Sequence, residues 1–262
     1  MHITIIGCGN MGSALAGRLS KTHQLYFYDH HFKNAEKLEQ EGYGKVCRDI
    51  KEATDHAELI ILAVKPQNVK EVGNLIGKEL KKEQVVISLS AGTSIESLKG
   101  FFPNAHIVRM MPNLAVIYGE GVIGLSSDEN IPQKNKEDLT KAFELLGKIH
   151  WLSEDKINAL TSLTGSGPAF FFAMVEAMVD AGIAMGFTAH TAQDLIYQML
   201  QGSLTLLEKT SKHPGELKWQ IASPQGTTIA GLKTLEEFAI RGGIMNTFLS
   251  AYDRANKLSL SD

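Results

Sequence analysis

The stretch ITIIGCGNMGSALAGRL near the N-terminus contains the first residues that could do chemistry. Gly7, Gly9 and Gly12 have the spacing G-x-G-x-x-G, which is typical of loops that bind the pyrophosphate of a dinucleotide. Gly7 would allow a tight turn, Gly9 would let the phosphates approach the backbone, and Gly12 would let a helix pack closely. Free N–H groups and the helix dipole would then favour the phosphate charge. The motif predicts that Asn10 and Met11 also contact the cofactor.

An acidic residue ends the next apolar segment, QLYFY. Asp29 stands 20 residues after Gly9, and an acid at this distance usually accepts hydrogen bonds from the adenosine ribose and disfavours a 2′-phosphate. A plain turn aspartate is the alternative. His30 and His31 follow and, if protonated, would tolerate a phosphate. The pattern leans toward NADH and leaves NADPH open.

A second glycine loop, SPQGTTIAGLKTLE, occupies residues 223–236. It combines the hydroxyl groups of Ser223, Thr227 and Thr228 with Gly226 at the start of a predicted helix. Free backbone N–H groups and hydroxyls together suit a small carboxylate. A capping box is the weaker interpretation, because no Glu or Gln stands at the required position.

In the first half of the sequence, apolar segments alternate with helical stretches, and these elements would position the first glycine loop and Asp29. The alternation predicts an α/β fold, a Rossmann-type doubly wound and mostly parallel sheet with helices on both faces. After Trp151 the strand signals stop, and the remaining sequence is almost wholly helical in pattern. We predict a dinucleotide-binding domain over residues 1–152 and an all-α substrate-binding and dimerisation domain over 153–262. The predicted strands are 2–6, 24–28, 58–63, 84–89, 106–110 and 121–125.

The helical half contains one segment, residues 168–187, that is apolar nearly all round. It carries Glu176 and Asp180, whereas a membrane-spanning helix has few or no charges. A helix apolar on all sides is more often buried, so we expect a central helix packed against a second subunit. Ser166 is the expected N-cap of this helix, and Pro168 is expected in its first turn. Another helix is expected to end near Gly147.

The composition of the chain argues against several other kinds of protein and site. The chain has 262 residues, of which 44% are hydrophobic, and a net charge of −3, so no basic surface favours nucleic acid. Cys8 and Cys47 form no disulfide framework, and the nine histidines lack the spacing of a metal site. Because the first residues already predict a core strand, we expect no signal peptide, no membrane association and a cytoplasmic location.

Four further stretches go beyond a generic dinucleotide domain: LAVKPQ (62–67), VRMMPN (108–113), TGSGPAF (164–170) and SPQGTTIAGLKTLE (223–236). Of these, LAVKPQ and the SPQGTT block are much more specific than the glycine loop. Together with GCGNMG the four stretches resemble pyrroline-5-carboxylate reductase, in the same order and at similar separations. The resemblance covers essentially the whole chain.

The resemblance implies a cofactor, NADPH or NADH, at the carboxyl edge of the sheet, where open α/β sheets bind ligands. A solvated lysine at a strand end is the alternative for Lys65. The residues implied to lie along the cofactor are Ala63, Val64, Lys65 and Pro66. Those implied to lie near the nicotinamide are Met111, Pro112 and Asn113.

The resemblance also implies a substrate and an assembly. Ser223, Gly226 and Thr227 would hold the substrate carboxylate, and the Thr228 hydroxyl would hydrogen-bond the ring nitrogen as the catalytic contact. The implied reaction is reduction of the cyclic imine L-1-pyrroline-5-carboxylate to L-proline, the last step of proline biosynthesis. The implied assembly is a homodimer, or a higher oligomer built from dimers, in which the substrate loop of one subunit faces the cofactor domain of another.

The sequence departs from the family pattern at a few positions. Gln225 stands where the family usually has glycine, Leu114–Ala115 replace Thr-Pro, and Ile50 replaces an asparagine. Because Gln225 could alter the selection of ring size, reduction of another small cyclic imine acid remains an alternative. Non-enzymatic nucleotide binding is a second alternative, and the intact SPQGTT loop argues against it. A 3-hydroxy acid dehydrogenase is disfavoured, because the helix FFFAMVEAMVDAG has no lysine.

Overall fold

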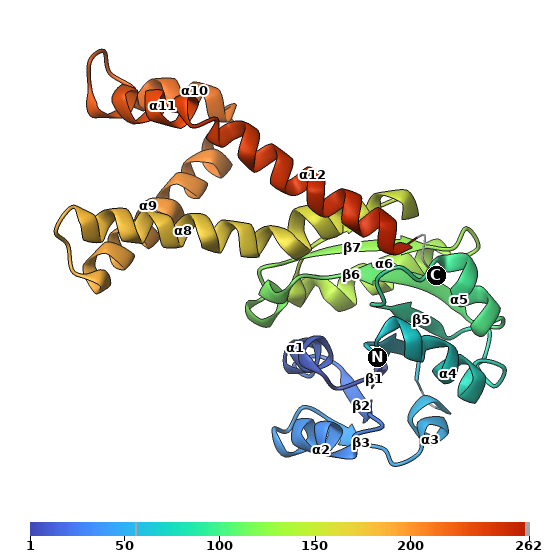
Figure 1. Ribbon diagram of the computed structural model, residues 1–262. Helices are drawn as coiled ribbons and strands as arrows, with labels where there is room; N and C mark the ends of the chain where they lie inside the picture. The colour runs from blue at the N-terminus through green and yellow to red at the C-terminus, as the bar shows by residue number, and fades with distance from the viewer. Residues whose placement is uncertain (56, 260–262) are drawn as a thin grey trace. The chain divides into compact units, whose positions relative to one another are not determined.

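A computed structural model describes residues 1–55 and 57–259 (Figure 1). Its contacts divide the chain into two compact units. One unit comprises Met1–Gly165 and the segment that begins at Tyr252, and the other comprises Ser166–Ala251. The domain boundary near residue 152 stays a prediction.

The first unit is built on one eight-stranded sheet with the order β3-β2-β1-β4-β5-β6-β7-β8. Strands β1 to β6 pair in parallel, β7 is antiparallel to β6, and β8 is parallel to β7. The order 3-2-1-4-5-6 is that of a doubly wound dinucleotide fold, so the predicted fold class is confirmed. The strands are β1 His2–Ile6, β2 Gln24–Tyr28, β3 Lys45–Val46, β4 Leu59–Leu62, β5 Val85–Ser88, β6 His106–Met111, β7 Gly121–Ser127 and β8 Gly147–Trp151.

Helices cover both faces of this sheet because successive strand residues point to opposite sides. Ile5 belongs to one buried cluster and Ile6 to the other. The first cluster packs α1, α2 and α6 on one face, and the second packs α3, α4 and α5 on the other. These helices are α1 Asn10–Leu19, α2 Phe32–Gln40, α3 Ile50–Asp55, α4 Pro66–Ile76, α5 Ile95–Phe101 and α6 Gln133–Phe143.

Two strands were not predicted. The expectation of a helical segment ending near Gly147 is confirmed: α6 stops at Phe143, and one 3-10 turn (η2, Glu144–Leu146) continues it with Gly147 as its C-cap. Strand β8, which was not predicted, begins at Gly147. In β8, half-buried residues alternate with exposed ones, as on a solvated edge strand. The pair Lys45–Val46 of β3 is too short to give a periodic signal.

The long apolar helix has no break where one was predicted. α7 Ile157–Leu160, a π-helical turn Thr161–Ser166 and α8 Gly167–Ala184 follow one another directly. Ser166 directly precedes α8, as expected, but it does not cap the helix: its φ and ψ are −87° and −32°, which are helical angles, and its side chain makes no capping hydrogen bond. Pro168 has no N–H, and the chain adjusts through the π turn instead of ending the helix.

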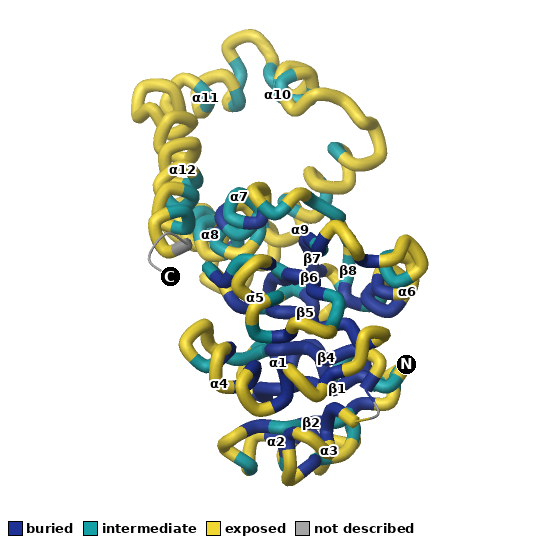
Figure 2. The backbone as a smooth tube through the Cα atoms, turned by 90° about the vertical axis from the view of Figure 1, so that its right-hand side faces the viewer, coloured by how far each residue is buried: buried dark blue, intermediate teal, exposed yellow. Residues whose placement is uncertain are grey.

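The second unit consists of helices with almost no core of their own. Figure 2 shows α8 to α11 mostly in the colour of exposed residues, whereas the strands of the sheet are buried. Among the described residues of 166–251, only Gly167, Val175 and Ala192 are buried. By length and composition alone, the helix that spans Glu154–Ala184 could cross a membrane. The remaining helices are α9 Ala189–Thr210, α10 Pro214–Ile221, α11 Thr227–Glu237 and α12 Ile240–Ser259.

Candidate functional site

The glycine loop lies where the strand order reverses, between β1 and β4. Gly7 has a φ of +97°, and a Cβ there would lie 2.6 Å from the carbonyl oxygen of Ala63. A Cβ on Gly12 would lie 2.0 Å from the carbonyl oxygen of Gly7. Both distances are shorter than van der Waals contact, so the tight turn and close helix packing predicted for these glycines are confirmed.

Gly9 differs from these two glycines, because no neighbouring protein atom requires a glycine at this position. A Cβ at this position would meet nothing within 4 Å, and its φ of −74° is open to any residue. Gly9 is the N-cap of α1, which has no side-chain cap and no acidic residue in its first turn. The backbone N–H groups of Asn10 and Met11 therefore have no acceptor within the helix. This open cradle of N–H groups fits the pyrophosphate of a dinucleotide.

Asp29 holds the glycine loop in place. Its Oδ2 accepts a hydrogen bond from the Cys8 N–H at 2.7 Å and its Oδ1 accepts one from the His31 N–H at 2.8 Å. Asn34 Nδ2 lies 3.4 Å from Oδ2. The residue is only 9% exposed. A direct contact between Asp29 and the adenosine ribose stays a prediction.

The other predicted cofactor residues follow β4 and β6 at the carboxyl edge of the sheet. The Ala63 N–H donates to the Ile6 carbonyl, which joins the loop after β4 to the glycine loop. Ala63, Val64 and Met111 are half-buried, Lys65 and Pro66 are exposed, and Pro112 is buried. One edge thus brings together the predicted residues of the first unit, and their cofactor contacts stay predictions.

Asn113 has a structural task that sequence reasoning did not find. Its Nδ2 donates to the Thr164 carbonyl at 3.0 Å, and its Oδ1 accepts from the Val122 N–H at 3.1 Å. Thr164 is four residues before Pro168, which has no N–H to offer that carbonyl. The buried Asn113 side chain therefore ties the π turn to the end of β6. The available signal was the proline that stands four residues after Thr164, in TGSGP.

Replacing Asn113 with alanine should lower the free energy of unfolding by about 2–3 kcal/mol, because it removes partners from the Thr164 carbonyl and the Val122 N–H. Urea unfolding at fixed protein concentration measures the loss. Asn113→Asp is the comparison: it keeps an acceptor for Val122 but sets a buried carboxylate against the Thr164 carbonyl, so it should be no more stable than the alanine variant. An alanine variant that unfolds with the wild type would show that this bridge is unimportant.

The second predicted loop has the geometry that its sequence indicates. The Gly226 N–H donates to the Ser223 carbonyl at 3.1 Å, closing a turn with Pro224 and Gln225 at its centre. Gln225 has a φ of +57°, a conformation that favours glycine at this position of a type II turn. Gln225 thus takes up the left-handed backbone angle that a glycine would adopt more easily. Gly226 is then the N-cap of α11, as predicted.

The threonines that begin α11 have hydroxyl groups with no hydrogen bond recorded in the described part of the chain. Elsewhere in these helices, threonine hydroxyls donate to the carbonyl four residues earlier, as in Thr205, Thr234 and Thr247. Thr227 and Thr228 lie in the first turn, where no helical carbonyl precedes them. Their hydroxyls and the first N–H groups of α11 remain available for an anionic ligand.

Both cysteine thiols are buried. Burial, and secondly the charge of Asp29, raise the pKa of the Cys8 thiol to about 12, so the thiol is neutral near pH 7. Burial also raises the pKa of the Cys47 thiol. Within residues 1–55 and 57–259, no cluster of three or more His, Cys, Asp or Glu side chains could hold a metal ion.

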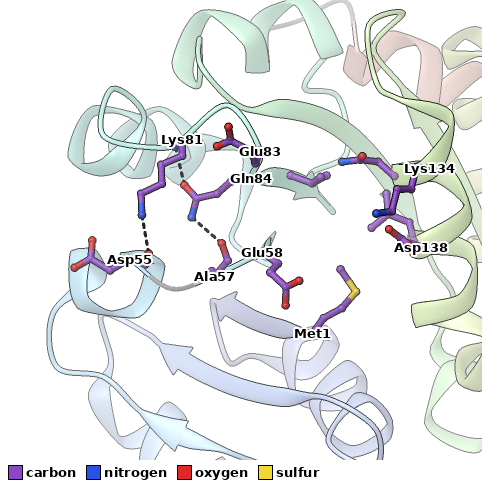
Figure 3. A pocket seen from close by; sticks show the side chains of 12 residues that line it. Met1, Asp55, Ala57, Glu58, Lys81, Glu83, Gln84, Lys134 and Asp138 are labelled. Atoms are coloured by element: carbon purple, nitrogen blue, oxygen red, sulfur yellow. Dashed lines mark hydrogen bonds between the residues drawn. The ribbon is translucent and has the colours of Figure 1, made fainter.

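A hollow of about 460 Å³ lies at the opposite, amino edge of the sheet (Figure 3). Gln84, in its wall, donates to the carbonyls of Thr54 and Ala57, and its Oε1 accepts from the Lys81 N–H. Lys81 Nζ donates to the Asp55 carbonyl, and Glu58 accepts from the His2 N–H. Because ligands of such folds bind beyond the carboxyl ends of the strands, this hollow is not the candidate site.

Comparison with known proteins gives two domain matches. Residues 154–258 match the domain described as pyrroline-5-carboxylate reductase dimerisation. Residues 2–92 match the domain described as NADP oxidoreductase, coenzyme F420-dependent.

Similar proteins extend over nearly the whole chain. Pyrroline-5-carboxylate reductase of Synechocystis is 31% identical over 98% of this chain and 98% of its own length. The Escherichia coli enzyme of that name is 29% identical over 99% and 98%. A crystal structure of Plasmodium falciparum pyrroline carboxylate reductase with NADP bound superposes with a TM-score of 0.89, at 28% identity, over 99% of this chain and 98% of that one.

Proposed function

The chain belongs to the pyrroline-5-carboxylate reductase family, and we propose from this premise how its residues act. The reaction is reduction of L-1-pyrroline-5-carboxylate to L-proline with NAD(P)H. We propose the cytoplasm as its location. The observation that supports the substrate site best is a pair of hydroxyls at the start of α11, on Thr227 and Thr228, for which the described residues offer no hydrogen-bond partner.

The loop 223–228 is the proposed carboxylate site. Ser223, Gly226 and Thr227 would bind the substrate carboxylate through hydroxyl and backbone N–H groups, at a helix end that favours negative charge. Thr228, one residue further along α11, would hydrogen-bond the ring nitrogen and fix the face of the imine. A protonated imine is already a strong electrophile, so orientation is the main contribution that the chain must make. Correct positioning can lower a barrier by roughly 7–11 kcal/mol.

The chain binds NADP(H), and the first unit has the cradle for it. Reduced nicotinamide, when bound, supplies the hydride for the C=N bond. The N–H groups around Gly9 would hold the pyrophosphate. The loops Ala63–Pro66 and Met111–Asn113 would support the rest of the cofactor along the carboxyl edge. Asn113, held by Thr164 and Val122, would keep the second of these loops rigid.

The helical unit forms a homodimer through the matched dimerisation domain. We propose that in the dimer the loop 223–228 of one subunit faces the cofactor domain of the other. Each active site would then need both chains.

The function is tested by mixing the protein with NADPH or NADH and L-1-pyrroline-5-carboxylate and following the loss of absorbance at the reduced nicotinamide band. Oxidation of the nucleotide with formation of proline is the expected result. The six-membered cyclic imine acid serves as a comparison substrate, because Gln225 could alter the selection of ring size. If only the six-membered compound is reduced, that compound is the substrate and L-1-pyrroline-5-carboxylate is not. If neither compound is reduced, the proposal that the protein is an imine reductase is wrong.

Thr228→Ala should lower kcat by about 10–100-fold, as expected for one lost hydrogen bond that orients the reacting group, while the Kd for NADPH stays unchanged. Thr228→Ser is the matched control, because it keeps the hydroxyl and should keep most of the activity. Steady-state kinetics and nucleotide titration measure both values. An alanine variant with the wild-type kcat would remove Thr228 from the reaction.

A further inference from the structure

A buried ion pair joins strand β6 to the residues that follow β8, and the proposed reduction step does not use it. Arg109 Nη1 donates to Glu154 Oε1 at 2.8 Å, and the same oxygen accepts a hydrogen bond from the Ile95 N–H at 2.8 Å. The Arg109 side chain is 8% exposed, whereas that of Glu154 is 35% exposed. Arg109 Nη2 is buried as well and has no hydrogen-bond partner within the described part of the chain. A buried pair that leaves one donor unsatisfied contributes little net stability, so the pair needs another explanation.

This ion pair holds one end of a short helical segment, and Asn113 holds the other end. Arg109, Met111 and Asn113 stand at alternate positions of an extended chain, so their side chains project from one face. Arg109 binds Glu154, at the start of the segment, and Asn113 binds the Thr164 carbonyl, at its end. The two side chains therefore hold the segment at both ends against the end of β6.

The middle of the same segment packs beside Met111. Gly124 of β7 is the register partner of Met111. A Cβ on Gly124 would lie 2.1 Å from Leu160 Cδ2, so the Leu160 side chain lies directly on the backbone of β7. The segment therefore packs on the sheet where β6 continues into the loop Met111–Asn113, which is expected to support the nicotinamide. A shift of the segment would displace that loop as well.

We infer that Arg109 and Glu154 are positioning residues, whose ion pair fixes the loop Met111–Asn113, and with it the nicotinamide, relative to this helical segment. The inference deepens the proposed function and rests on it. The dimerisation match begins at Glu154, so the pair ties the cofactor loop to the first residue of the part of the chain that forms the dimer. A guanidinium–carboxylate contact is directional, so it fixes orientation as well as distance. Because a displacement of about 1 Å can slow a reaction by up to about 100-fold, the pair should act on hydride transfer more than on nucleotide binding.

The double variant Arg109→Met/Glu154→Gln, in the full-length dimer, separates positioning from stability. Methionine fills the space of the buried guanidinium without a charge, and glutamine still offers an oxygen to the Ile95 N–H. Replacing a buried ion pair by uncharged groups of similar size is often neutral for stability, so the thermal unfolding midpoint should stay within a few degrees of the wild type. With saturating NADPH and L-1-pyrroline-5-carboxylate, kcat should nevertheless fall about tenfold.

Two binding measurements without substrate show where the change acts. The fluorescence anisotropy of bound NADPH should fall in the double variant, because the nicotinamide is held less rigidly. The Kd for 2′,5′-ADP, which lacks the nicotinamide, should stay within about twofold. Lys37→Met/Glu41→Gln is the matched control: it makes the corresponding changes in an exposed ion pair of α2 and should leave all of these values unchanged.

Two results would overturn the inference. A folded double variant with the kcat and the NADPH anisotropy of the wild type would show that the pair is only structural. Equal losses of affinity for NADPH and 2′,5′-ADP would mean that the pair acts on the adenosine half of the cofactor site. If the double variant does not fold, Glu154→Gln alone carries the same comparison, with an expected loss in kcat of at least about threefold. A wild type that does not reduce L-1-pyrroline-5-carboxylate would contradict the proposed reaction, and the anisotropy of bound NADPH would still decide the inference.

Discussion

Gly9→Ala is expected to fold as stably as the wild type and to bind NADPH one to two orders of magnitude more weakly. A Cβ at this position touches no protein atom, and its backbone angles suit alanine. The methyl group would instead occupy the space from which the pyrophosphate approaches α1. Overpacking of this kind costs roughly 1–3 kcal/mol, which gives the expected loss in affinity. Calorimetric titration with NADPH and thermal unfolding measure the two effects separately.

Gly12→Ala is the matched comparison. Its Cβ would lie 2.0 Å from the Gly7 carbonyl oxygen, a backbone atom that cannot move aside without displacing the loop. This variant should therefore lose both stability and NADPH affinity. If Gly9→Ala binds NADPH as the wild type does, the proposed pyrophosphate site is wrong even when Gly12→Ala behaves as expected.

Ala177→Glu should abolish the dimer and the activity together. Ala177 lies in α8, a helix in which Gly167 and Val175 are the only residues buried within the described chain. Large apolar side chains of the second unit are exposed, and a hollow of about 350 Å³ between α8 and α12 is lined mostly by apolar groups. A second subunit must cover this surface, and a buried unpaired glutamate costs several kcal/mol. Exposed apolar residues include Phe172, Met185, Leu195, Leu204, Trp219, Phe238 and Met245.

Light scattering and steady-state turnover on the same sample test the dimer prediction. Lys70→Glu, on the exposed face of α4, is the control for an added negative charge and should leave the dimer intact. An Ala177→Glu monomer that still reduces the substrate would contradict an active site shared between subunits.

Much of the fold follows from local patterns that tertiary contacts do not override. Short apolar runs rich in isoleucine, such as Ile3–Ile6 and Leu59–Leu62, are typical of strands in a sheet covered on both faces, and the glycine loop specifies the first crossover. The edge strand β8 was missed because Ile149 and Trp151 alternate with Lys148 and His150 only briefly after a 3-10 turn. The π turn was missed because Pro168 usually indicates a helix start, and only the Asn113 bridge shows otherwise.

Features of the candidate site that depend on the type of a single residue could be predicted from the sequence. Features that depend on a contact between residues distant in the sequence could not. The turn at Gly7 and the helix start at Gly226 follow from residue type. The occupied carboxylate of Asp29 depends on Cys8, 21 residues away, and no spacing rule indicates that contact.

The most direct test of the whole account is a crystal structure of the dimer with NADPH and L-proline bound together. The account predicts that the proline carboxylate contacts Ser223, Gly226 and Thr227, and that the Thr228 hydroxyl lies within hydrogen-bond distance of the ring nitrogen. The ring would then lie against a nicotinamide held beside Met111–Asn113. If residues 223–228 lie remote from every nicotinamide in the assembly, the proposed active site is wrong.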